Sequence, residues 1–350
     1  MRFLKDFSAF ALYVGLCICL LITMLIALKI GTVELQYSEV ISVIMSQLTS
    51  GTAIEAPDKG AVHDIIWLLR MPRIILAMII GMGLSVCGVI MQAVVKNPLA
   101  DPYILGVSSG ATLGATSAIL LGIGIKLGAD FVGIAAFGGA FIVSLAVLFI
   151  ANIGGQANSV KLLLAGIALS AVCSAFSSFI VYFANNKDGI QNIIYWLMGS
   201  FAGAKWSTLI LICPLIIACI IYFWSQSRIL NLMLLGDESA ITLGTDLHFY
   251  RQVFLLVSSL IVGFAVYTSG MIGFVGLIIP HVVRMLVGTD HKKVLPLSAL
   301  CGAIFLVFSD TLCRVLLPGT ELPIGILISL IGAPCFVYLM LKKTYGFGGQ

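Results

Sequence analysis

The chain has 350 residues, of which 60% are hydrophobic and only 10% are charged. Soluble domains carry about 25% charged residues, so this composition excludes an ordinary soluble globular protein. The formal net charge of +4 is spread along the chain without a basic tract, which argues against nucleic-acid binding. Long apolar stretches recur from end to end and predict an all-α membrane protein with several transmembrane helices, rather than a β-barrel.

The first apolar run covers residues 7–28 and follows Arg2 and Lys5. It is longer than the apolar region of a signal peptide, which has about 7–15 residues, so we expect a first transmembrane helix. A spanning helix needs about 20 mostly apolar residues. Nine further runs are candidates, at residues 72–95, 102–122, 131–152, 162–184, 207–226, 252–268, 272–288, 296–317 and 323–341. The sequence therefore predicts a compact bundle of ten transmembrane helices, forming a single polytopic domain over residues 1–350.

The basic residues indicate how this bundle is oriented. With the N-terminus inside, eleven of the 19 lysines and arginines lie on the inner side and eight on the outer side. This bias follows the positive-inside rule, and the opposite orientation would place the pairs Lys292–Lys293 and Lys342–Lys343 outside. We therefore expect both termini in the cytoplasm.

Three arginines, Arg70, Arg73 and Arg314, fall on the outer side against this bias. Asp310 precedes Arg314 by four residues, a helical spacing at which the two side chains can pair. His281 lies within a predicted span, where an ionisable group is a functional candidate. It also follows a proline, whose freed backbone carbonyls it could satisfy, so a structural role for His281 stays open.

A polar segment, residues 225–251, separates the sixth and seventh predicted spans on the inner side. It predicts one or two short helices, with Gly236 and Gly244 flanking the sequence DESAITL. A short helix on the cytoplasmic face could fit a cleft on a soluble partner. A surface loop without such a role is the alternative.

Motifs of several enzyme classes are missing from the chain. It contains no G-x-x-x-x-G-K-[ST], so it does not bind ATP by that route, and it contains no H-E-x-x-H. Its nine cysteines lie almost wholly in apolar runs without a C-x-x-C, as expected of free thiols, and its four histidines show no metal-ligand spacing. We therefore expect no enzymatic activity of this chain and no metal or cofactor bound by it.

The stretch RMPRIILAMIIGMGLSVCGVIMQAVVKNPLADPYILGVSSGATLGA resembles the signature of the FecCD family. These proteins are permease subunits of bacterial ABC importers for iron–siderophore complexes, haem and cobalamin. The resemblance continues through LGDESAITLG, GFVGLIIPHVVRMLVG and ELPIGILISLIGAPCFVYLML, and extends from about residue 67 to residue 343. It implies ten helices per subunit, two cytoplasmic termini, and a pore between two permease subunits, which we expect to be a homodimer in the bacterial inner membrane.

The resemblance also implies partners and assigns roles to residues. Two cytoplasmic ABC ATPase subunits would carry ATP and Mg, and an extracytoplasmic binding protein would deliver the substrate. Arginines at the outer rim would pair with acidic residues of that binding protein: Arg70, Arg73 and Arg314. A coupling segment would dock on the ATPase: Leu235, Gly236, Asp237, Glu238, Ser239, Ala240, Leu243 and Gly244. Two inner turns would form the cytoplasmic gate: Asn97, Leu99, Ser159 and Val160.

The expected function is thus that of an ABC importer permease of the cobalamin/siderophore type. The preferred prediction for the transported substrate is an iron–siderophore chelate, and haem and cobalamin are alternatives. The rival prediction is a stand-alone secondary transporter driven by an ion gradient. Such a protein would need buried ionisable groups near the midplane of the membrane, for which His281 is the only indication.

Overall fold

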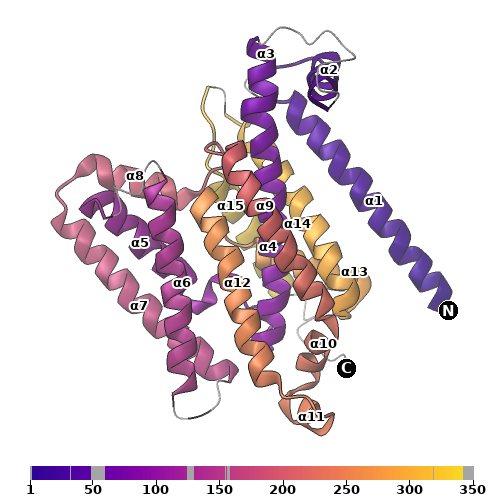
Figure 1. The fold of residues 1–350 in the computed structure, drawn as a ribbon, viewed down its shortest axis with the longest axis vertical. Helices are drawn as coiled ribbons and strands as arrows, with labels where there is room; N and C mark the ends of the chain where they lie inside the picture. The colour runs from indigo at the N-terminus through magenta and orange to yellow at the C-terminus, as the bar shows by residue number, and fades with distance from the viewer. Residues whose placement is uncertain are drawn as a thin grey trace.

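Long helices make up most of the chain (Figure 1). The computed structural model describes residues 2–31, 33–48, 60–123, 130–153, 155, 158–317 and 319–341. The first half contains α1 (Arg2–Lys29), α2 (Tyr37–Leu48), α3 (Ala61–His63), α4 (Met71–Val95), α5 (Val107–Leu121), α6 (Phe131–Asn152) and α7 (Ser159–Phe183). The second half contains α8 (Lys187–Met198), α9 (Trp206–Ser225), α10 (Ser227–Leu235), α11 (Asp237–Thr242), α12 (Leu247–Ser269), α13 (Val275–Val287), α14 (His291–Cys313) and α15 (Ile324–Leu341). A π-helical segment, η1 (Asp64–Arg70), and a 3-10 helix, η2 (Pro102–Leu105), complete the elements of the described residues, which include no strand.

The apolar helices confirm the predicted membrane fold. Among the described residues, seven helices are long and apolar enough to cross a membrane, and three shorter apolar helices cover Val107–Leu121, Val275–Val287 and Ile324–Tyr338. Together they fall on the ten runs predicted from the sequence. The short helices α2 and α8 lie between the predicted spans, where the sequence predicts no helix.

The second predicted span begins earlier than expected. The sequence places its start at Pro72, whereas the helix runs continuously from Ala61 to Val95. Proline inside an α-helix removes a hydrogen bond and clashes with the preceding turn. Here the π-helical segment η1 lies immediately before it, and the Met71 N–H donates to the Ile66 carbonyl, five residues back. The wider turn thus lets the helix continue through Pro72.

Helix α4 forms the centre of the bundle. In the span that contains it, 83% of the most apolar window is buried, compared with 17% for α1 at the edge. Small residues let the backbones approach closely. A Cβ atom on Gly88 of α4 would lie 1.8 Å from the carbonyl oxygen of Gly276, and one on Gly114 of α5 would lie 2.1 Å from that of Ala135 in α6. Gly110 and Gly114 of α5 therefore lie on one face, where the backbone of α6 comes close. Gly106 ends η2 with a φ of 76°.

The helices place the polar segments at two opposite ends of the molecule. In Figure 1, α2, α3 and α8 lie toward the upper end, and the N-terminal end of α1, α10 and α11 lie toward the lower end. The orientation predicted from the basic residues would put the lower end in the cytoplasm. We call the end with α11 the inner end and the end with α2 and α3 the outer end.

Candidate functional site

A buried ion-pair cluster lies at the outer end, between the start of α4 and the end of α14. Arg73 Nε donates to both carboxylate oxygens of Asp310, at 3.0 Å each. Arg314 Nε lies 3.3 Å from Asp310 Oδ2, which confirms the i, i+4 pair predicted from the sequence. Arg73 Nη1 also reaches Glu321 Oε2 at 2.8 Å. Asp310 is 1% exposed, so two arginines share one buried carboxylate.

Arg70 occupies a different environment, against the C-terminal end of α1. Its Nη1 donates to the carbonyl oxygens of Leu28 at 2.6 Å and Lys29 at 2.8 Å, and its Nη2 donates to that of Val33. The last carbonyls of a helix lack partners within the helix, so a guanidinium there satisfies them and complements the helix dipole. With 6% of Arg70 exposed, this geometry gives it a structural role, and its predicted docking role stays a prediction.

All three predicted docking arginines border one cavity of about 260 Å³ at the outer end, together with Glu321. The chain therefore brings Arg70 and Arg73 next to Arg314, more than two hundred residues away in the sequence. The three guanidinium groups outnumber the two nearby carboxylates, those of Asp310 and Glu321, which leaves the cluster with an excess of positive charge. Arg73 is the most accessible of these three arginines, with 11% of its side chain exposed.

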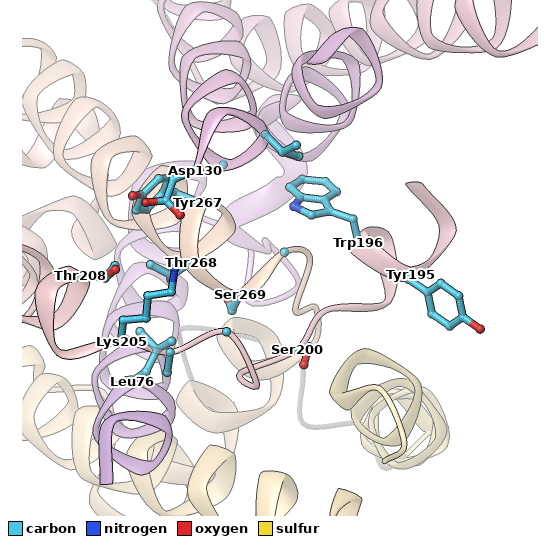
Figure 2. A pocket seen from close by; sticks show the side chains of 15 residues that line it. Leu76, Asp130, Tyr195, Trp196, Ser200, Lys205, Thr208, Tyr267, Thr268 and Ser269 are labelled. Atoms are coloured by element: carbon cyan, nitrogen blue, oxygen red, sulfur yellow. The ribbon is translucent and has the colours of Figure 1, made fainter. Parts of the chain in front are cut away.

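A second cavity at the outer end, of about 330 Å³, was not anticipated from the sequence. Figure 2 shows Asp130 and Tyr267 on one side of it, Lys205 on another, and Trp196 across from them. These residues come from the start of α6, the end of α12, the residue before α9 and the end of α8. No local spacing connects four such segments, so only the packed bundle reveals this polar cavity.

At the inner end, Asp237 links three elements. As the first residue of α11, it accepts from Lys96 Nζ at 3.0 Å, directly after α4, and from Arg251 Nη2 at 2.8 Å, in α12. Burial alone would raise the pKa of Asp237, but the hydrogen bonds and charges of Lys96 and Arg251 outweigh it and lower this pKa below its usual value. The Asp237 carboxylate is therefore held in its charged form.

Helix α11 presents an apolar surface outward. Gly236 and Gly244 bound it as predicted, with φ values of 102° and 77° that favour glycine. Ala240 is fully buried against the bundle. Around it, large apolar side chains are exposed: Leu235 at 62%, Ile241 at 67% and Leu243 at 63%. With Asp237, Glu238 and Ser239, these residues form the segment for which the sequence predicts a coupling role, and that role stays a prediction.

The two predicted gate turns lie beside each other at the inner end. Ser159 Oγ, at the start of α7, donates to the Val94 carbonyl at the end of α4, at 3.4 Å. The Asn97 side chain accepts from the Leu99 N–H at 2.9 Å, which fixes the turn after α4. Val160 is 62% exposed on the surface of the subunit. The structure brings these four residues near one another, and their gating role stays a prediction.

The described residues contain no group of three or more His, Cys, Asp or Glu side chains that could hold a metal ion. All nine cysteines are free. His281 lies in α13, half-buried, directly after Pro280.

Comparison with known proteins identifies the family. The FecCD transport family model matches residues 19–342. Vitamin B12 import system permease protein BtuC from Salmonella paratyphi A and that from Salmonella typhimurium are each 40% identical over 279 residues, which cover 80% of this chain and 84% of the relative.

Solved structures agree with this assignment. A chain described as belonging to a metal-chelate type ABC transporter, in an inward-facing conformation, has a TM-score of 0.80 at 33% identity, over 95% of this chain and 99% of that chain. A chain of PsaBC from Streptococcus pneumoniae in complex with Fab has a TM-score of 0.52 at 17% identity, over 78% of this chain and 94% of that chain, and shares the fold alone. The protein described here thus belongs to the FecCD transport family and has the fold of an ABC importer permease.

Proposed function

We propose that this chain is the permease subunit of an ABC importer that moves a metal chelate across the bacterial inner membrane. The observation that carries the proposal is the exposed apolar helix α11, tied by Asp237 to α4 and α12. A transport subunit that takes its energy from a separate ATPase needs such a docking surface connected to its membrane helices. Membership of the FecCD transport family supports the same function.

The proposed coupling runs from α11 to the inner turns. A pair of ABC ATPase subunits, which carry ATP and Mg, would bind α11 and displace it on closing. Lys96 would transmit the displacement to the turn of Asn97 and Leu99, which follows it directly, and Arg251 would transmit it to α12. Since rigid helices pass such shifts along their length, one ion-paired carboxylate can connect the ATPase surface with the gate.

A second permease subunit would complete the passage. Helix α7 starts at the proposed gate and exposes large apolar side chains along its length: Leu164 at 62%, Ile167 at 62%, Phe176 at 58% and Phe179 at 61%. A two-fold axis beside α7 would place the Ser159 and Val160 pairs of two identical subunits around one inner opening.

At the outer end, the arginine-lined cavity would receive the substrate-binding protein. Its surplus positive charge would attract carboxylates of the partner, acting mainly on the rate and orientation of encounter. Arg73 and Arg314, which are both paired with Asp310, would contribute positive charge to this surface. Arg70 would hold the end of α1 against this surface.

Two cargoes have support. The family resemblance favours a ferric siderophore. The 40% identical relatives named as vitamin B12 import permeases favour cobalamin. The stand-alone secondary transporter has no comparable support, because the family and fold are those of ABC importers.

Uptake in cells tests the proposal. A strain lacking its own permease would express this chain with its partner ATPase and binding protein, and would be given radiolabelled cobalamin or ferric siderophore. We expect uptake of one cargo that survives an ionophore and stops when ATP is depleted. Uptake abolished by the ionophore at constant ATP would overturn the proposal in favour of the secondary transporter.

A further inference from the structure

A groove opens at the inner end, where the end of α9, the start of α10 and the start of α14 meet. It encloses about 460 Å³ and is lined by Ile221 and Trp224 of α9, Arg228 and Asn231 of α10, and Asp290 and Lys292 of α14 and its N-cap. It lies apart from α11 and from the outer cavities. Neither the resemblance nor the proposed function gives it a role.

One wall of the groove is apolar and faces outward from the bundle. Ile221 is 58% exposed and Trp224 is 47% exposed. Trp224 Nε1 donates to the Lys292 carbonyl at 3.1 Å, which anchors the indole across α9 and α14. A tryptophan with its N–H satisfied and its ring exposed at a helix end is typical of the membrane interface.

The other wall carries positive charge. Arg228 and Lys292 are both exposed, and within the described residues neither side chain has an ion-pair partner. Asp290 is the acid of the groove, and its carboxylate already accepts from Asn231 Nδ2 at 2.9 Å and from the Lys292 N–H at 3.1 Å. Two cations therefore remain to meet an anionic group beside an apolar wall.

We propose that this groove binds one anionic phospholipid of the inner leaflet. Its phosphate would lie between Arg228 and Lys292, and an acyl chain would follow Ile221 along α9. The apolar wall continues onto the exposed surface of α9, where Ile217 is 41% and Ile210 is 75% exposed, which favours a lipid over a free anion. A zwitterionic lipid would bring a positive group toward two cations and lose most of this attraction.

Trp224 provides a local probe of the groove. The other three tryptophans lie at the outer end: Trp67 and Trp206 pack at a ring distance of 4.9 Å, and Trp196 lines the outer cavity. The full chain would be reconstituted in phosphatidylcholine bilayers that contain a small fraction of brominated phosphatidylglycerol or of brominated phosphatidylcholine. The fluorescence of Trp224 is obtained by subtracting the emission of a Trp224→Phe variant from that of the unmodified chain. Quenching of this fluorescence shows that a brominated acyl chain lies beside the indole.

We expect half-quenching of Trp224 at a roughly tenfold lower fraction of the anionic lipid than of phosphatidylcholine. In Arg228→Gln/Lys292→Gln the two lipids should quench equally. The control Lys161→Gln/Lys187→Gln removes the same charge elsewhere and should keep the preference. Three results would overturn the proposal. The two lipids could quench the unmodified chain equally, or the preference for the anionic lipid could survive in Arg228→Gln/Lys292→Gln. The third is that this preference is lost in Lys161→Gln/Lys187→Gln as well. The emission of the outer tryptophans, unchanged in every variant, verifies that the fold is intact.

Discussion

The carboxylate of Asp310 accepts two hydrogen bonds, at 3.0 Å each, from the Nε of Arg73, which lies 237 residues earlier in the chain. This pair joins the start of α4 to the end of α14 below the outer surface. It turns two of the predicted docking arginines into parts of one buried network, since Arg314 shares the same carboxylate. The outer surface therefore depends on Asp310, which is itself almost inaccessible.

Replacing Asp310 should destabilise the outer end more than any single change at its surface. In Asp310→Asn, Arg73 and Arg314 would keep their charges in a buried site without a shared counter-ion. Breaking a buried pair in this way costs about 3–5 kcal/mol. Thermal unfolding in detergent should show a clear loss of stability. Glu321→Gln is the matched control, because Glu321 is 39% exposed and such pairs contribute about 1 kcal/mol or less. Equal losses in the two variants would contradict the central role of Asp310.

Arg70→Gln should detach the end of α1 from the bundle. The variant leaves the carbonyls of Leu28, Lys29 and Val33 without their guanidinium donor, and each buried group without a partner costs about 1–3 kcal/mol. We expect faster proteolysis of the segment after α1 and lower thermal stability. Binding of the substrate-binding protein should change less than in Arg73→Gln. If instead Arg70→Gln abolished that binding without changing the stability of the chain, Arg70 would be a docking residue, as the family resemblance implies.

Asp237→Asn should uncouple the ATPase from transport. The variant keeps the size of the side chain and the apolar surface of α11 but loses the ion pairs with Lys96 and Arg251. In proteoliposomes we expect ATP hydrolysis close to that of the unmodified complex and substrate uptake lowered about tenfold or more, as the loss of a charged hydrogen bond worth about 1.5–3 kcal/mol allows. Glu238→Gln, the adjacent acid without an ion pair in the described residues, should transport normally. Loss of ATPase binding in Asp237→Asn would mean that Asp237 contacts the partner directly.

The ion pairs of Asp237 with Lys96 and Arg251 should weaken only at acidic pH. The pKa of Asp237 is lowered in the folded chain, despite its partial burial, by hydrogen bonds and charges from Lys96 and Arg251. A carboxylate with a lowered pKa contributes stability that is present above its ordinary pKa, about 4, and is lost as pH falls through the lowered value. Protease sensitivity of the α10–α12 segment should therefore stay constant from neutral pH to about pH 5 and rise only below pH 4. Asp237→Asn should be sensitive throughout. A rise centred near neutral pH in the unmodified chain would contradict this assignment.

The sequence determined the elements that depend on local composition. Apolar length predicted ten helices, because crossing a membrane requires about 20 apolar residues whatever surrounds them. Gly236 and Gly244 predicted the limits of α11, because their positive φ angles favour glycine in any context. The pair of Asp310 with Arg314 followed from helical spacing. Each of these features is decided within a few residues of the chain.

Only the tertiary structure decided which charges meet. Arg73 with Asp310, Arg70 with the end of α1, and Lys96 with Asp237 are pairs far apart in sequence. The same holds for the groove of Trp224, Arg228 and Lys292, which three helix ends form together. The physical reason is that burial makes a charge costly unless it is paired, and helix packing decides which groups are buried together. The order of residues specified the helices, and the packing of small residues between them specified which of their charges became structural and which stayed accessible to partners.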